Sequence, residues 1–188
     1  NFKLDLDGDS LDIRSLEASA PALALSGKVL VEQLSKAPRV DGGVQLDLKL
    51  TDLGKLLPPS QLKKIPGELK SAGTVQLSVQ AKGATADLAA MDLKAQLAFK
   101  GVDLAYGAMP GLSALDGTLS VDKAGASLPA LAFKLDGEPA TLALKAQWGS
   151  LDKLKAGSVD VDLSLKAAKL NIEPVLAIAL AEDTPEDI

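Results

Sequence analysis

The stretch TVQLSVQAKG, residues 74–83, alternates apolar and polar side chains with a period of two. A β-strand points successive side chains to opposite faces, so this alternation predicts a strand with one apolar and one polar face. The pattern returns in VQLDLKL from Val44, DLKAQLAFKG from Asp92 and SVDVDLSLKA from Ser158. It is typical of antiparallel sheets solvated on one side. Further strands are expected near residues 20–32, 115–122, 128–136 and 140–148.

The N-terminal stretch LDLDGDSLDI, residues 4–13, carries carboxylates that raise the question of a calcium loop. An EF-hand loop beginning at Asp5 needs glycine at its sixth position and glutamate at its twelfth, but Ser10 and Leu16 stand there. A start at Asp7 fails in the same way. The Asp7-Gly8 step instead predicts a type I′ turn between two strands. Three further steps predict similar turns: Asp41-Gly42, Asp116-Gly117 and Asp136-Gly137.

Composition excludes several classes of function. The 188 residues suit one substantial domain, and the net charge of −5 disfavours nucleic acid as a partner. The chain has neither cysteine nor histidine, which removes thiol nucleophiles, imidazole acid–base chemistry and the usual zinc ligands. Apolar residues make up 47% of the chain and aromatic residues only 3%, so an aliphatic interior is expected. We expect no enzyme activity, no metal and no cofactor.

The remaining polar and aromatic candidates have ordinary alternatives. The pairs Asp5/Asp7 and Asp160/Asp162 lie two residues apart on strands, which favours a solvated face over a catalytic pair. Lys63-Lys64 is either a solvated basic pair or a contact for a headgroup phosphate. Tyr106 and Trp148 suit either a groove rim or ordinary packing at the edge of a core.

Helical signals are few. Asp52 and Ser60 can each cap a short helix, and Asn171 can cap a third one near the C-terminus. The tail, residues 182–188, is acidic and is expected to be solvated or disordered. No apolar run reaches the roughly 18 residues of a membrane span. The chain also begins within a strand-like pattern, so we expect a segment cut from a longer protein, from which any targeting signal could have been lost.

Two internal similarities indicate a repeat. VQLDLKLTDLGKLLP from Val44 aligns with VDLSLKAAKLNIEPVL from Val161, each a strand followed by a capped helix. More loosely, PALALSGKVLVEQ from Pro21 resembles PALAFKLDGEPATLALKAQ from Pro129, each interpreted as strand, glycine turn and strand. The alternative is that amphipathic strands always look alike. We expect residues 1–188 to form a single segment of two strand-rich units, about 1–105 and 106–181, before the tail.

An apolar sheet face must be covered by another layer or by something outside the chain. The fold expected is mainly β, with antiparallel amphipathic sheet and a few short helices, arranged as a curved open groove or an incomplete β-sandwich. In an open groove, aliphatic side chains would line a trough for acyl chains. The residues expected to line it are Val75, Leu77, Val79, Leu93, Ala95, Leu97, Phe99, Leu142, Leu144, Val159, Val161, Leu163 and Leu165.

Residues 46–83 and 102–146 resemble the AsmA-like family of bacterial envelope proteins. The family phrase Leu-x-x-Leu-x-Gly-x-Leu matches Leu112, Leu115, Gly117 and Leu119. A helix turn after a strand matches Asp52-Leu53-Gly54, and an apolar-Gly-x-Pro-x-x-Leu step matches Leu135, Gly137, Pro139 and Leu142.

The resemblance implies a taco-like repeating β-groove in the periplasm of a Gram-negative bacterium. It also implies anchorage in the inner membrane by an N-terminal helix that this segment lacks. The groove would carry phospholipid towards the outer membrane, or support outer-membrane biogenesis, without catalysis. The family motifs are structural, so no ligand residue carries over. The alternative function is a structural or partner-binding β-sandwich, such as a spacer or adhesion module, with no lipid ligand.

Overall fold

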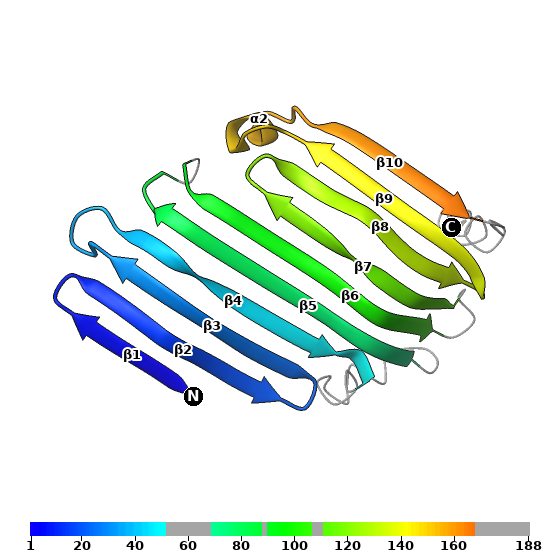
Figure 1. Ribbon diagram of the computed structural model, residues 1–188, viewed down its shortest axis with the longest axis horizontal. Helices are drawn as coiled ribbons and strands as arrows, with labels where there is room; N and C mark the ends of the chain where they lie inside the picture. The colour runs from blue at the N-terminus through cyan, green and yellow to red at the C-terminus, as the bar shows by residue number, and fades with distance from the viewer. Residues whose placement is uncertain (52–68, 88–89, 107–110, 168–188) are drawn as a thin grey trace, which may run out of the picture.

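A single open sheet dominates the computed structural model, which describes residues 1–51, 69–87, 90–106 and 111–167 (Figure 1). Its ten strands pair antiparallel, each with the next along the chain. The expectation of a mainly β, antiparallel, amphipathic fold is confirmed, in its curved and open form. The strands are β1 (Phe2–Asp7), β2 (Ser10–Ala20), β3 (Leu23–Glu32), β4 (Arg39–Lys49), β5 (Leu69–Ala84), β6 (Asp92–Tyr106), β7 (Leu112–Asp122), β8 (Gly125–Leu135), β9 (Glu138–Gln147) and β10 (Asp160–Ala167).

Tight turns join several neighbouring strands. Asp136 and Gly137 link β8 to β9 with φ values of +51° and +87°, the left-handed pair that a type I′ turn requires. The prediction of a turn at this step is confirmed. The β1–β2 hairpin is also confirmed, but its loop is Gly8-Asp9, because Asp7 pairs with Ser10. Only Gly8 has a positive φ, +56°, which indicates a type II′ turn rather than the expected type I′.

Two predicted turns are wrong. Asp41-Gly42 lies inside β4, and Asp116-Gly117 lies inside β7 beside irregularities in its pairing with β8. At Gly42 the reason for glycine is close approach, since an added Cβ would stand 2.5 Å from the backbone oxygen of Lys28 on β3. Gly27 likewise lies inside β3. The looser internal similarity therefore aligns one strand with a complete hairpin.

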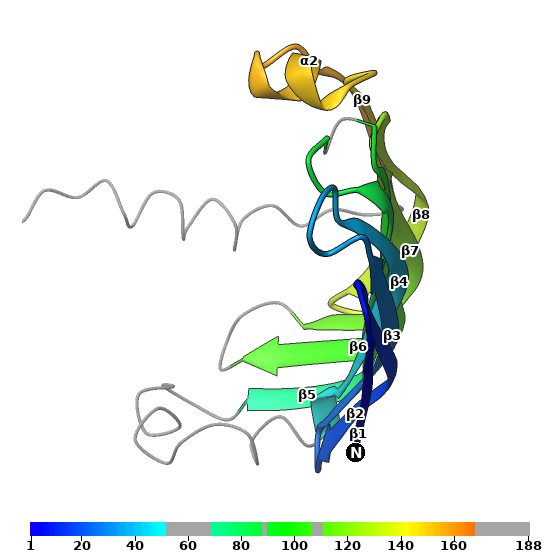
Figure 2. The ribbon, with the colours of Figure 1, turned by 90° about the vertical axis from the view of Figure 1, so that its left-hand side faces the viewer.

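The two longest strands bend out of the sheet. β5 and β6 have 16 and 15 residues, and their paired ends project from one side in Figure 2. The bend coincides with breaks in register at Gly73 and Gly101, whose φ values are +89° and +54°. These left-handed conformations suit glycine and are strained for other residues. A β-bulge bends the strand that contains it and changes the direction of the residues that follow.

The densest core lies at this bend. Leu50, Val102 and Leu115 are buried there, and Val102 is only 1% exposed. The half-buried apolar side chains packed on them come from β4 to β8 and are Leu48, Val75, Phe99, Leu112, Leu131 and Phe133. We call this group the bend core.

One short helix, α2 (Leu151–Lys155), was not expected from the sequence. The Ser150 hydroxyl accepts a hydrogen bond from the Lys153 amide at 3.3 Å, as an N-cap does. Gly157, at φ +74°, follows its C-terminal end. Figure 2 shows α2 projecting on the same side of the sheet as the ends of β5 and β6.

The three predicted helices and the acidic tail lie outside the described residues. In the part of the chain that is described, no helix has the length and apolarity to cross a membrane.

Candidate functional site

The strand register gathers aliphatic side chains on one face of the sheet. Directly paired residues of neighbouring strands share a face. Leu25 pairs with Leu46, Leu46 with Leu77, Leu77 with Leu97, and Leu97 with Leu119. We call this surface the apolar face. It comprises Phe2, Leu4, Leu6, Leu11, Ile13, Leu23, Leu25, Val29, Val31, Val40, Val44, Leu46, Leu48, Val75, Leu77, Val79, Leu93, Ala95, Leu97, Phe99, Leu119, Val121, Leu128, Leu131, Leu142, Leu144, Val161, Leu163 and Leu165.

Outside the bend core, much of the apolar face is accessible to solvent, although Leu128 of β8 is buried. Leu77 and Val79 are 37% and 41% exposed even on the central strand β5. On the edge strands, Leu6 of β1 is 64% exposed and Leu163 of β10 is 67% exposed. Contiguous apolar surface of this kind is uncommon on soluble proteins and marks an interaction site or a ligand groove.

The opposite face is polar and internally hydrogen-bonded. Asp47 on β4 accepts hydrogen bonds from Gln45 Nε2 at 2.9 Å and from Gln76 Nε2 at 2.7 Å. The hydrogen bond from Gln45, followed by that from Gln76, lowers the pKa of Asp47. Lys82 Nζ lies 2.6 Å from Asp41 Oδ2, and this hydrogen bond raises the pKa of the lysine. On β4 and β5 the polar face therefore pairs several of its own polar side chains.

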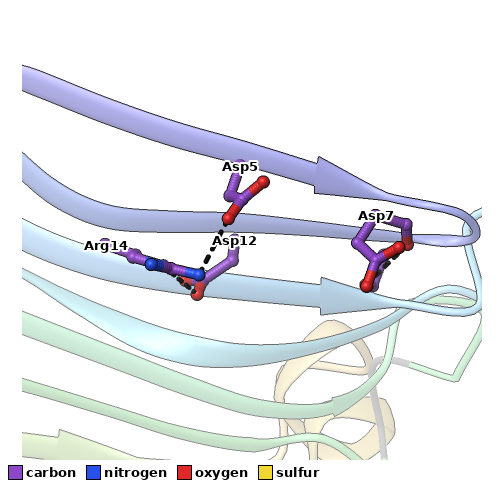
Figure 3. Close-up of polar contacts among 5 residues, drawn as sticks. Asp5, Asp7, Asp12 and Arg14 are labelled. Atoms are coloured by element: carbon purple, nitrogen blue, oxygen red, sulfur yellow. Dashed lines mark hydrogen bonds and ion pairs between the residues drawn. The ribbon is translucent and has the colours of Figure 1, made fainter.

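Two of the N-terminal carboxylates, those of Asp5 and Asp12, pair with Arg14 on the polar face (Figure 3). Arg14 donates from Nη2 to Asp5 Oδ2 at 2.8 Å and from Nε to Asp12 Oδ2 at 3.0 Å. The Ser10 hydroxyl donates to the backbone oxygen of Asp7 at 3.0 Å. The contacts from Arg14 to Asp5 and from Ser10 to Asp7 join the two strands of the β1–β2 hairpin. Within the described ranges no three acidic side chains converge as metal ligands would.

Twelve of the thirteen residues expected to line a groove share the apolar face. Val75, Leu77 and Val79 pair with Phe99, Leu97 and Ala95, and Leu93 pairs with Ala81. Leu142 and Leu144 pair with Leu165 and Leu163, and Val161 pairs with Ala146. The thirteenth residue, Val159, precedes β10 and lies outside the sheet, so its placement in a strand was wrong.

The other candidates divide between the described and undescribed parts. Trp148 is half-buried beyond the end of β9, where its Nε1 donates to the Lys123 backbone oxygen at 2.9 Å. This bond fixes the indole at the β7–β8 turn. Tyr106 ends β6, with its backbone paired to Leu69. Lys63-Lys64 lies outside the described residues.

Residues of the first four strands also belong to the apolar face, although the groove lining expected from the sequence began at Val75. Leu4, Leu25 and Leu46 carry the same alternation. The same period-two signal therefore sufficed to find them. The bend core was missed because Val102 becomes buried through the bulges at Gly73 and Gly101, which interrupt the alternation.

The chemistry available on this surface is apolar contact. Among the described residues, no polar or charged side chain is buried. Catalytic groups usually acquire perturbed pKa values through burial and close charges in a cleft. Among the described residues, the shifted pKa values of Asp47 and Lys82 arise from hydrogen bonds on the polar face.

Comparison with known proteins identifies no relative. No protein-family model, curated protein or solved structure matches the chain.

Proposed function

We propose that this chain binds phospholipid acyl chains on its apolar face and passes them along the sheet without catalysis. In this proposal it is a periplasmic segment of an inner-membrane-anchored AsmA-like protein that serves outer-membrane biogenesis in a Gram-negative bacterium. The observation that carries the lipid proposal is the exposure of one apolar face that runs through all ten strands. The family and the location rest on the sequence resemblance.

The dimensions of the sheet support a path rather than a single pocket. Neighbouring strands lie about 4.8 Å apart, so ten strands extend the apolar face over roughly 43 Å. The lining is almost wholly Leu, Val, Ile and Ala, which offer apolar contact without fixed hydrogen-bond geometry. An acyl chain on such a surface gains about 0.8 kcal/mol for each methylene removed from water. Because neighbouring positions are chemically alike, movement between them needs no large barrier.

The polar face explains how lipid would occupy one side only. Polar side chains such as Asp47, Gln76 and Lys82 are hydrogen-bonded there, and desolvating this face under an acyl chain would carry a penalty. Headgroups would remain in water along the rim. The chain's net charge of −5 further disfavours simple adsorption to anionic bilayers.

The experiment is a titration with a fluorescent fatty acid, using neighbouring residues of β5 as a matched pair. Val79 lies on the apolar face, whereas Gln80 lies on the polar face, and both are exposed. Val79→Asp should weaken binding about tenfold, because a charge would then oppose the acyl chain. Gln80→Asp adds the same charge and should leave binding unchanged. Equal affinities for the two variants would refute binding on the apolar face.

Transfer needs its own measurement. Fluorescent phospholipid in donor vesicles should move to acceptor vesicles faster with the wild-type chain, and this acceleration should fall with Val79→Asp. Failure to bind any lipid would leave a structural or partner-binding role as the better account.

A further inference from the structure

Among the described residues, no strand is paired with the outer edge of β10. β10 pairs with β9 in an unbroken eight-residue register, and no described residue pairs with its other edge (Figure 1). All eight residues are exposed, and the strand contains neither proline nor a bulge. The free N–H and C=O groups of an edge are a template for another strand, and natural sheets guard them with these devices or with charged side chains. β10 carries Asp160, Asp162 and Lys166.

The opposite edge is different. β1 is six residues long and its register with β2 shifts between Lys3 and Leu4. Its Asp5 is held by Arg14 at 2.8 Å. By contrast, no ion pair joins Asp162 or Lys166 of β10 to another described residue. Charged side chains on β10 are therefore available to a strand laid beside it.

The charge pattern of β10 is complementary to itself. An antiparallel copy centred on Ser164 places Asp162 opposite Lys166 twice, and one centred on Leu163 places Asp160 opposite Lys166 twice. In both registers the aliphatic residues of the two copies meet on the same face, because the period of two is preserved. Opposite charges facing each other across strands stabilise such a pair.

Pairing of β10 with β1 of another copy is less favourable. In an antiparallel β1–β10 pair, every residue of β1 can have a partner on β10. Two of these registers also place the apolar residues of both strands on the same face. One places Asp5 opposite Asp162, and the other places Lys3 opposite Lys166. Like charges directly opposite destabilise a strand pair.

We propose that two copies of this chain associate through antiparallel pairing of their β10 strands. The contact is isologous, as a two-fold dimer requires. It joins two ten-stranded sheets edge to edge, with one apolar face continuous across both. Backbone hydrogen bonds between the two β10 strands provide the affinity. The reciprocal Asp–Lys pairs determine the direction and register of the pairing. The dimer does not depend on lipid.

Sedimentation equilibrium of charge variants tests this contact. Lys166→Glu makes β10 wholly acidic, and Asp160→Lys with Asp162→Lys makes it wholly basic. Each variant alone should dimerise at least tenfold more weakly than the wild type, while a one-to-one mixture should form a heterodimer. Circular dichroism of each variant verifies that the sheet is intact. A wild-type chain that stays monomeric, or a dimer insensitive to Lys166→Glu, would overturn the proposal.

Cross-linking locates the contact independently. The chain has no cysteine, so a disulfide can form only where one is introduced. Ser164→Cys or Leu163→Cys should yield a covalent dimer under mild oxidation, and the more efficient of the two identifies the register. Lys3→Cys, on the other edge, should stay monomeric. Cross-linking of Lys3→Cys alone would contradict pairing through β10.

Discussion

The bend core and the exposed β10 edge carry the same kind of side chain in opposite surroundings. Val102 is 1% exposed, whereas Leu163 is 67% exposed. The difference lies in strand length and backbone: β5 and β6 are long enough to bend over their own apolar face, while β10 has only eight residues. The comparison teaches that apolar character alone does not create a core in this sheet; a second layer does.

The largest predicted effect comes from placing a charge in the bend core. Val102→Asp should lower the free energy of unfolding by about 3–5 kcal/mol or abolish folding, since the carboxylate would be buried without a partner. Leu163→Asp, the matched substitution on the open surface, should change it by less than about 0.5 kcal/mol. Urea denaturation of both variants measures the contrast, and similar losses would contradict it.

The bend itself should be sensitive to one methyl group. In Gly73→Ala the new Cβ would stand 2.3 Å from the Gly101 backbone oxygen, at a φ of +89°. We expect a loss of about 2–3 kcal/mol, because strain and a clash combine. Gly8→Ala also has a positive φ but nothing within 4 Å, so it should lose only about 1 kcal/mol. Equal losses in thermal or urea unfolding would exclude the close approach as the cause.

A charge at the centre of the open sheet should separate binding from folding. Leu97 is half-buried and its surroundings are open to water on one side. Leu97→Asp should therefore lose about 1 kcal/mol of stability and keep its circular dichroism spectrum, while uptake of a fluorescent fatty acid falls about tenfold. Unfolding of this variant would show instead that the apolar face is covered in solution.

The smallest effect concerns the polar face. The folded-state pKa of Asp47 is lowered from 3.8 by its hydrogen bonds with Gln45 and Gln76. Its carboxylate therefore stabilises the fold above pH 3.8, and this contribution is lost as the pH falls through the folded pKa. Asp47→Asn should lower stability by less than about 0.5 kcal/mol at pH 7, and less again at pH 3. A stability difference between the wild type and Asp47→Asn that grows as the pH falls would contradict this account.

Much of the fold could be predicted because alternation is a local signal. The period of two at Leu77, Leu97 and Leu144 predicts both the strands and the face they share. In an up-and-down sheet each strand pairs with its neighbour in sequence, so the order of the strands needs no further information. Alternation did not decide between a curved open groove and an incomplete β-sandwich, and the single ten-stranded sheet settles that choice for the described residues.

The errors arose where backbone geometry depends on distant contacts. Asp41-Gly42 has the composition of a turn, but its glycine serves the close approach of β3 and β4. The bend at Gly73 and the burial of Val102 depend on pairing between strands about thirty residues apart along the chain. α2 was missed for a different reason: the hydrogen bond from the Lys153 amide to the Ser150 hydroxyl is local, but a five-residue helix gives too short a pattern to recognise.

Native mass spectrometry of the gently purified chain, with extraction of any adduct, tests the central claim most directly. The account predicts a complex whose extra mass is phospholipid, and loss of that mass in Leu97→Asp. A bare protein mass from wild-type chain purified in the presence of phospholipid would contradict an apolar face that binds acyl chains.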